Sequence, residues 1–147
     1  MPVHRSLPRL PTIAITLIAC LLPGCAAVEL QKTADGICTQ PDSGLMWQQD
    51  GSGPFHSWEA AKAYADELTL GGYSDWRLPT TTELYVLHNI LELKPRGGCR
   101  PGVGGSLWSG ATKAEASVGY WESYPLCGGS EYRYHKGKHG HVLAVRP

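Results

Sequence analysis

The chain has 147 residues, with 13 basic and 13 acidic side chains and a formal net charge of zero. This length allows one domain with a modest core and is too short for two domains of ordinary size. The balanced charge gives no indication of a nucleic-acid partner. The charge is unevenly distributed, because residues 94–147 include eight basic and three acidic side chains. This segment either presents a cationic face to an anionic partner or carries interspersed charge that only solubilises the chain.

The N-terminus has the pattern of a secretory signal. Basic residues precede an apolar run from Leu10 to Leu22, which is shorter than the roughly 18 residues that a membrane-spanning helix needs. The run ends in Leu22-Pro23-Gly24-Cys25, which resembles a bacterial lipobox. We therefore predict a lipoprotein signal peptide over residues 1–24 and an acylated Cys25 that anchors the mature protein in a lipid bilayer. The alternative is cleavage after Ala27, which would release a periplasmic or secreted protein.

The residues after the predicted lipidation site indicate where the mature protein lies. Ala26 resembles the sorting signal for the outer membrane, so we expect an outer-membrane lipoprotein of the cell envelope. Residues 25–34 have no apolar period and are predicted to be a tether. The folded domain is then expected over residues 35–147.

The first part of the domain predicts a hairpin and a helix. Residues 37–39 and 44–48 are expected to be short strands, because the Pro41-Asp42-Ser43-Gly44 segment between them favours a turn. From Ser57 to Leu70, apolar residues recur every three or four positions, which predicts a helix with one buried face. The pair Gly71-Gly72 is expected to end this helix.

A short segment containing Asp75, Trp76 and Arg77 joins this helix to a second one. A large aromatic side chain between opposite charges predicts a ring in the core and ion pairs or hydrogen bonds that fix the segment around it. We interpret these three residues as a structural keystone, meaning a segment that holds both helices against the core. Thr80 and Glu83 have the spacing of a capping box, and the apolar period that follows predicts the second helix.

The remainder predicts a loop followed by strands. Residues 94–105 are rich in glycine, proline and arginine and are expected to be a loop. Strands are predicted at residues 106–110, 120–124, 131–135 and 141–146, with the last two forming a hairpin around residues 136–140. The expected fold class is α+β, with two helices packed on a small antiparallel sheet and long irregular loops.

Three cysteines remain in an oxidising compartment after removal of the signal and acylation of Cys25. Cys99 and Cys127 both lie in glycine-rich loops, where backbone freedom favours closing a bridge, and we predict that they form a disulfide. Cys38 would then be a buried thiol in the first strand. A bridge between Cys38 and one of the other two is the alternative.

Several motifs along the predicted domain are shared with one known family. They are Gly44–Gln48, Trp58–Ala61 with Tyr64, Gly72–Thr80 with Glu83 and Leu84, Leu107–Ser109, Tyr120-Trp121, and Val142–Arg146. With these motifs the chain resembles the Lcl C-terminal domain-like family, which is found in bacterial surface proteins and lipoproteins. The motif Gly72–Thr80 is the most specific of them. One departure is Ala144, where many members have a cysteine, so their disulfide pairing is not carried over.

The resemblance has implications for fold and function. The family is similar to the C-type lectin-like and sulfatase-modifying-factor group, so it implies a C-type lectin-like domain. That group includes glycan binders, protein-binding adhesins and oxidising enzymes that rely on particular cysteines. The founding member of the family is linked to binding sulfated glycans. Since fold does not supply function, the residues themselves must be weighed.

The sequence contains no nucleophile elbow, P-loop, zinc-protease helix or dinucleotide-binding fingerprint. We therefore predict no catalytic residue and no cofactor. His135, His139 and His141 are candidate metal ligands, although a turn rich in lysine and histidine is more often a solvated tip. A second hypothesis is a site for a sulfated or phosphorylated polyanion. Its candidate residues are Arg96, Arg100, Arg133, Lys136 and Lys138.

Aromatic residues in the same region allow contacts with sugar rings. Trp108, Trp121, Tyr132 and Tyr134 could stack on sugars, and the alternative is that they fill the core. We expect a non-catalytic binding module of the bacterial envelope whose partner is an anionic glycan or another envelope protein. The alternatives are a purely structural envelope lipoprotein and an enzyme with an unknown hydrolase or redox activity.

Overall fold

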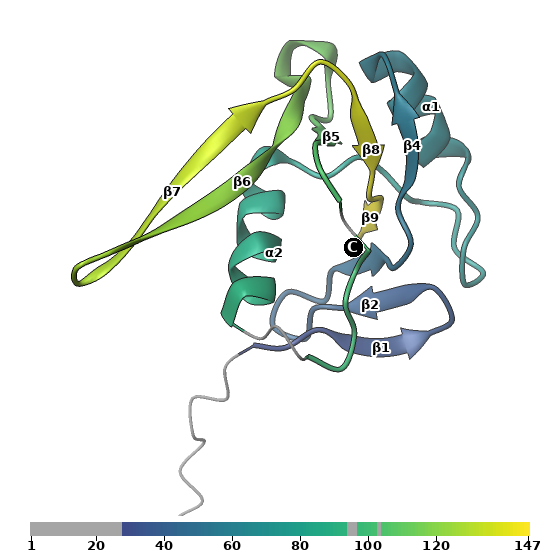
Figure 1. The fold of residues 1–147 in the computed structure, drawn as a ribbon. Helices are drawn as coiled ribbons and strands as arrows, with labels where there is room; N and C mark the ends of the chain where they lie inside the picture. Colours follow the sequence, from purple (N-terminus) through teal and green to yellow (C-terminus); the bar gives the residue numbers. More distant parts are fainter. Residues whose placement is uncertain (1–27, 94–96, 103) are drawn as a thin grey trace, which may run out of the picture.

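The computed structural model describes residues 28–93, 97–102 and 104–147, and in these ranges two helices accompany two β-sheets (Figure 1). The helices are α1 (Trp58–Glu67) and α2 (Thr81–Leu93), with a short 3₁₀ helix, η1 (Lys113–Glu115). The strands are β1 (Gln31–Ala34), β2 (Ile37–Thr39), β3 (Met46–Gln48), β4 (Ser52–Phe55), β5 (Leu107–Ser109), β6 (Ser117–Leu126), β7 (Gly129–Lys136), β8 (Gly140–Val142) and β9 (Val145–Arg146). The α+β class is confirmed.

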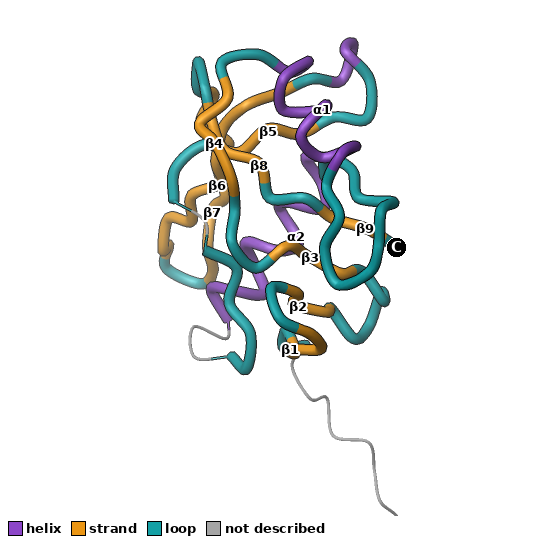
Figure 2. Tube along the Cα trace, turned by 90° about the vertical axis from the view of Figure 1, so that its right-hand side faces the viewer, coloured by secondary structure: helices purple, strands orange, loops and turns teal. Residues whose placement is uncertain are grey.

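The strands form two separate sheets rather than the single small sheet that we expected. The first has the order β1-β2-β3-β9 and the second the order β4-β8-β5-β6-β7. Pairing is antiparallel except between β5 and β8, where Leu107 lies opposite His141. The C-terminal segment belongs to both sheets, because β8 lies in the second and β9 in the first. Leu143 and Ala144 connect the two strands (Figure 2). Both residues, like Val142 and Val145 beside them, are fully buried.

The hairpin predicted around residues 136–140 is wrong. β7 pairs along its length with β6, from Gly119 opposite Lys136 to Leu126 opposite Gly129. β8 instead pairs with β4 and β5. The chain passes close to the backbone of Ser106, since a Cβ atom on Gly140 would lie 2.5 Å from the Ser106 carbonyl oxygen. This approach directs the chain toward β5 instead of back along β7.

The hairpin of β2 and β3 is confirmed. Ile37 lies opposite Gln48, and the intervening turn is closed by a 2.8 Å hydrogen bond from the Gly44 amide to the Gln40 carbonyl oxygen. The predicted tether, by contrast, is wrong over its second half. Residues 31–34 form β1 on β2, and Leu30 is 1% exposed. The signal peptide, residues 25–27 and the lipidation site Cys25 lie outside the described residues.

Helix α1 begins where the sequence predicts and ends earlier. The hydroxyl group of Ser57 accepts the Ala60 amide at 3.2 Å, which caps the N-terminus. The helix ends at Glu67, with Leu68 as its C-cap in an extended conformation, so the expectation that Gly71 and Gly72 end it is wrong. These two glycines belong to a separate turn in which Leu70 and Tyr73 exchange two backbone hydrogen bonds of 3.1 Å. Its buried positions are alanines, which allows close packing against the second sheet.

The segment between the helices is fixed to the C-terminal strand. Trp76 is 2% exposed, and its indole N–H donates to the Tyr73 carbonyl oxygen at 3.2 Å. The backbones of Arg77 and Val145 exchange two hydrogen bonds of 2.9 Å. The side chains of Asp75 and Arg77 do not pair with each other, since Asp75 binds Arg146 and Arg77 binds Glu83. The three residues therefore connect both helices to β9.

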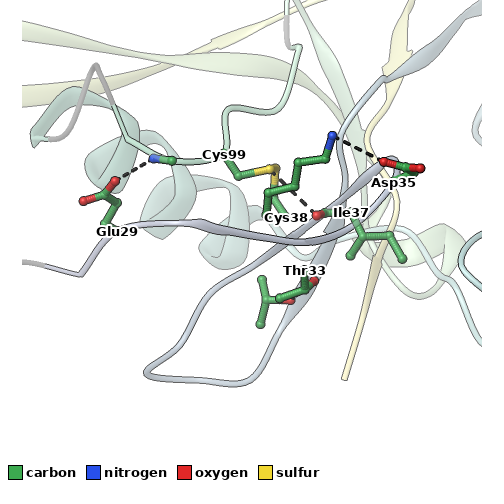
Figure 3. Close-up of a disulfide and its surroundings, with 9 residues drawn as sticks. Glu29, Thr33, Asp35, Ile37, Cys38 and Cys99 are labelled. Carbon is green, nitrogen blue, oxygen red and sulfur yellow. Dashed lines mark hydrogen bonds and ion pairs between the residues drawn. A yellow bond between two sulfur atoms is a disulfide. The ribbon is translucent and has the colours of Figure 1, made fainter.

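The predicted disulfide between Cys99 and Cys127 is wrong. Cys38 of β2 is bonded to Cys99, with their Cα atoms 5.5 Å apart, so Cys38 is not a free thiol (Figure 3). The Cys99 amide also donates to the Leu30 carbonyl oxygen at 3.0 Å. Cys127 is free and exposed in the turn between β6 and β7, at the tip of the long hairpin (Figure 1). The bridge thus attaches the segment after α2 to the first sheet.

Buried side chains form two clusters. One lies between the first sheet and α2 and includes Trp47, Leu87 and Leu143. The other lies under α1 and includes Trp76, Trp108 and Val142. Neither helix in the described ranges has the length and apolar character needed to cross a bilayer.

Candidate functional site

The β6–β7 hairpin extends beyond the rest of its sheet, and α2 lies beside it (Figure 1). Because side chains alternate along a strand, the hairpin has two faces. On one face, the indole N–H of Trp121 donates to the Thr81 carbonyl oxygen of α2 at 3.3 Å, and Ser123 donates to Glu92 at 2.9 Å. Tyr132 lies opposite Ser123 and so belongs to the same face. This face is turned toward α2.

A hollow of about 420 Å³ lies between α2 and this face of the hairpin, and we call it the aromatic groove. It is lined by Thr81, Thr82, Tyr85, Trp121 and Tyr132. The ring of Tyr85 is central, because its centroid lies 4.9 Å from that of Trp121 and 5.3 Å from that of Tyr132, edge-on in both cases. These are favourable geometries for aromatic pairs, so the three rings support one another.

A second hollow of about 300 Å³ shares Trp121 with the groove, and we call it the leucine pocket. It is lined by Leu84, Leu87, His88, Leu91, Gly105, Leu107, Gly119, Tyr120 and Trp121. Most of its side chains are apolar, and its polar groups include the His88 imidazole and the Tyr120 hydroxyl group. The Nε2 atom of His88 is buried and has no hydrogen-bond partner.

These two hollows define what the arrangement can do chemically. Their lining residues include aromatic rings, leucine side chains, two threonine hydroxyl groups and one imidazole. No aspartate, glutamate, lysine or arginine is among them. The lining therefore suits an uncharged ligand with flat apolar faces and a few hydrogen-bonding groups.

The four aromatic residues predicted to contact sugars have different positions. Trp121 and Tyr132 line the aromatic groove. Trp108 is buried, and its indole N–H donates to the Phe55 carbonyl oxygen at 3.0 Å. Tyr134 packs across Gly119, and its hydroxyl group lies 3.0 Å from that of Ser117. The last two therefore have structural contacts.

The opposite face of the hairpin carries a polar cluster. The Tyr124 hydroxyl group donates to the carboxylate of Glu122 at 2.6 Å, and this hydrogen bond raises the pKa of Tyr124. The Nε2 atom of His135 lies 3.1 Å from the same carboxylate. Arg133 lies over the Tyr124 ring and binds Glu131 at 2.8 Å. The hydrogen-bonding groups and charges of these side chains are therefore largely paired within the cluster.

The three histidines proposed as metal ligands are not brought together. His135 belongs to the polar cluster, the His139 ring lies 5.4 Å from that of His56, and His141 is in β8. In the ranges that the structure describes, no three histidine, cysteine, aspartate or glutamate side chains form a group that could hold a metal ion. The hypothesis depended on a β7–β8 hairpin, which does not form.

The cations proposed for a polyanion site are also dispersed. Arg133 and Lys136 lie on opposite faces of β7, because three positions separate them on a strand of period two. Arg100 follows the disulfide-bonded Cys99, at the first sheet. Lys136 and Lys138 are exposed at the end of β7, and Arg96 lies outside the described residues. The four of these cations that the structure describes therefore do not form a single cluster.

Sequence reasoning missed two residues of the site, Tyr85 and His88. They are three positions apart on α2 and therefore share one side of the helix, beside its buried leucine stripe. This spacing was a usable signal, but it did not indicate which strand the side would face.

The class of protein is thus an α+β domain with an aromatic groove between its second helix and a long hairpin. Residues 36–146 match the family model of the Lcl C-terminal domain. Because the match covers more than half of the chain, the protein belongs to this family, as its motifs indicated. No curated protein and no solved structure matches the chain significantly.

Proposed function

We propose that this protein is a non-catalytic, glycan-binding module of the bacterial cell envelope, anchored at the outer membrane through an acylated Cys25. The observation that carries the proposal is the convergence of the Tyr85, Trp121 and Tyr132 rings around one hollow with two threonine hydroxyl groups. A sugar ring has apolar C–H faces and a polar rim. Aromatic rings contact the faces, while hydroxyl groups bind the rim.

The groove is held in shape before any ligand binds. Trp121 is oriented by its hydrogen bond to the Thr81 carbonyl oxygen, and Tyr85 is held between Trp121 and Tyr132 by edge-on contacts. A ligand would therefore order few side chains on binding. Such preorganisation favours affinity because less conformational entropy is lost.

Lys136 supports one part of the expected polyanion site, namely a contact with an acidic group of the glycan outside the groove. It lies two positions from Tyr134 on the same face of β7 and is exposed. An uncharged sugar ring in the groove could thus belong to a longer chain whose acidic groups reach Lys136. Arg133 contributes less, since it faces away and is paired with Glu131.

A C-type lectin-like arrangement is part of the same proposal. It is supported by the two helices, the family membership and residues 97–102, which belong to no helix or strand and which the Cys38–Cys99 bridge attaches to the first sheet. Fold by itself leaves the ligand undefined, so the groove carries the functional argument.

A glycan array probed with the purified protein tests the function. Tyr85→Ala and Tyr132→Ala remove two walls of the groove, while Tyr124→Ala alters the opposite face of the same hairpin and is the matched control. We expect the wild type and the control to retain the same glycan and both groove variants to lose at least about tenfold in affinity, roughly 1.4 kcal/mol. Equal retention by all four folded proteins, or no retained glycan, contradicts the proposal.

The anchor requires a separate test. Cells expressing the full chain should incorporate labelled palmitate into the protein, and Cys25→Ser should abolish the label and release the protein from the membrane fraction. Labelling that persists in the variant would exclude Cys25 as the lipidation site.

A further inference from the structure

The proposed acyl anchor would hold one end of the domain close to the bilayer. Leu30 is 1% exposed, and its carbonyl oxygen accepts the Cys99 amide at 3.0 Å. The chain is therefore fixed to the domain from Leu30 onward, only five residues after Cys25. Since an extended residue spans at most about 3.6 Å, covalent geometry limits the distance between Cys25 and Leu30 to roughly 18 Å. A surface on this side of the domain is thus within reach of the lipid headgroups.

Two contacts place the end of α2 and the β6–β7 hairpin on the same side as Leu30. The Gly98 amide, shortly after α2, donates to the carboxylate of Glu29 at 2.5 Å. The Ser123 hydroxyl group donates to Glu92 in the last turn of α2 at 2.9 Å. Figures 1 and 2 agree, because the start of the described chain, the C-terminal end of α2 and the turn between β6 and β7 lie in the lower half of the domain in both views.

Residues 123–130, which we call the hairpin tip, contain only uncharged side chains. Leu126 of the tip is 58% exposed, and Leu93 at the end of α2 is 74% exposed. Isolated exposed leucines are ordinary on protein surfaces. These two, however, have the highest exposures among the large apolar side chains of the described residues, and both lie on the side of the anchor. A partner that covers them would therefore be an apolar one next to the anchor.

The polar groups further along the hairpin follow the order expected at a membrane surface. Tyr124 is the second residue of the tip, and its hydroxyl group donates to Glu122 at 2.6 Å. The first charged residues of β7, Glu131 and Arg133, form an ion pair of 2.8 Å. Tyrosine is enriched at membrane–water interfaces, and a paired charge is less costly there than an unpaired one. An exposed leucine, a tyrosine and then paired charges therefore match the gradient from the hydrocarbon boundary to water.

Resting on the proposed acylation of Cys25, we infer that the hairpin tip is a second contact of this protein with the lipid bilayer. Leu126 and Leu93 enter the interfacial region, and Tyr124 lies at the level of the lipid headgroups. Removal of the leucine side chains from water stabilises the contact. Two separate attachments restrict rotation of the domain about its anchor and give the aromatic groove a fixed orientation to the membrane.

Fluorescence quenching in vesicles tests this contact. A nitrobenzoxadiazole label on Cys127, which is free and exposed, reports on the tip. The matched control is the same label on Ala114→Cys in a Cys127→Ser background, because residue 114 lies in η1 at the opposite end of β6 (Figure 1). The acylated protein is reconstituted in vesicles of phosphatidylethanolamine and phosphatidylglycerol whose acyl chains carry nitroxide groups. We expect quenching of the label at Cys127 and none at residue 114. Equal quenching at both positions overturns the inference.

Charged variants locate the contact. Leu126→Asp and Leu93→Asp should each reduce quenching of the label on Cys127, and the double variant should abolish it, because an unpaired carboxylate is costly to transfer from water into a bilayer. Ala114→Asp adds the same charge at the opposite end of β6 and should leave the quenching unchanged. Circular dichroism establishes that each variant is folded. Unchanged quenching in the folded double variant overturns the inference.

The outcomes separate this inference from the proposed function. Palmitate labelling reports on the anchor independently, so an acylated protein whose tip is not quenched overturns the inference and leaves the function standing. If no palmitate is incorporated, the anchor and the inference fail together, while the glycan array still tests the groove. The unacylated Cys25→Ser protein tests another occupant. A Cys127 label whose spectrum shifts with protein concentration in lipid-free solution would assign the tip to a second copy of this chain and overturn the membrane contact.

Discussion

The guanidinium group of Arg77 forms two hydrogen bonds with the carboxylate of Glu83, at 2.9 and 2.8 Å. The same carboxylate accepts the Thr80 amide at 2.8 Å, while the Thr80 hydroxyl group accepts the Glu83 amide at 3.0 Å. This arrangement joins the segment around Trp76 to the first turn of α2. It therefore positions the helix that forms one wall of the aromatic groove.

Glu83→Gln should destabilise the fold by about 1–2 kcal/mol, because it removes the charge from a bidentate ion pair and weakens the helix cap. Urea unfolding followed by circular dichroism measures the change. Glu67→Gln at the end of α1 is the control, and we expect an effect within about 0.5 kcal/mol. Equal losses in both variants would show that the Arg77–Glu83 pair has no special role.

The same pair predicts how stability depends on pH. Burial raises the pKa of Glu83, but hydrogen bonds from Arg77 and Thr80 outweigh it and leave this pKa below its ordinary value of 4.5. The hydrogen bond from Arg146 lowers the pKa of Asp75 below 3.8. Because both pKa values are lower in the folded state, the unfolded chain binds protons more readily. The stabilisation from these two carboxylates is therefore fully present above their unfolded pKa values and is lost as the pH falls through their folded pKa values.

We therefore expect the urea midpoint to be flat above about pH 5 and to fall steadily below it. The fall should be shallower in Glu83→Gln, which has one carboxyl group fewer to protonate. A midpoint that is independent of pH between 5 and 2.5, or an identical slope in the variant, would contradict this assignment.

Trp76→Ala should cost about 3–5 kcal/mol, because it removes a large, almost fully buried side chain from the cluster under α1. Leu93→Ala is a suitable control, since this leucine is 74% exposed at the end of α2 and should matter little. Thermal unfolding of the two variants should differ clearly in midpoint. Similar midpoints would place Trp76 outside the core.

The Cys38–Cys99 bridge closes a loop of 61 residues, for which the chain-entropy argument gives about 4 kcal/mol of stabilisation. The double variant Cys38→Ser with Cys99→Ser should lose a stabilisation of this order, whereas Cys127→Ser should change stability by less than about 0.5 kcal/mol. Mass mapping without reductant should find Cys38 linked to Cys99, and a maleimide should label Cys127 in the folded protein. A bridge to Cys127 would overturn the pairing.

Sequence patterns succeeded where the deciding contacts are local. The cap formed by Thr80 and Glu83 spans one helical turn, and the turn between β2 and β3 is closed by residues four positions apart. In both cases the side chains and backbone that decide the geometry are neighbours in the chain. The burial of Trp76 was also predicted, because a large ring between charged residues has few other stable environments.

The incorrect predictions concern partners that are distant in the sequence. Residues 126–129 and residues 136–140 both favour a turn, but only the first turn connects two paired strands. The glycine-rich surroundings of Cys99 and Cys127 suggested a bridge, although backbone freedom does not determine distance. The hairpin separates these two cysteines and the first sheet places Cys38 beside Cys99.

By itself, the sequence determined the fold class, the two helices and the connecting segment with its buried tryptophan, since short-range periodicity and capping encode them, and its motifs indicated the family. Only the tertiary structure decided the strand order, the disulfide partner and the aromatic groove. Tyr85, Trp121 and Tyr132 come from α2, β6 and β7, and they meet because α2 packs along one face of the hairpin. No local pattern contains that contact, because it depends on which surfaces are buried together when the whole chain folds.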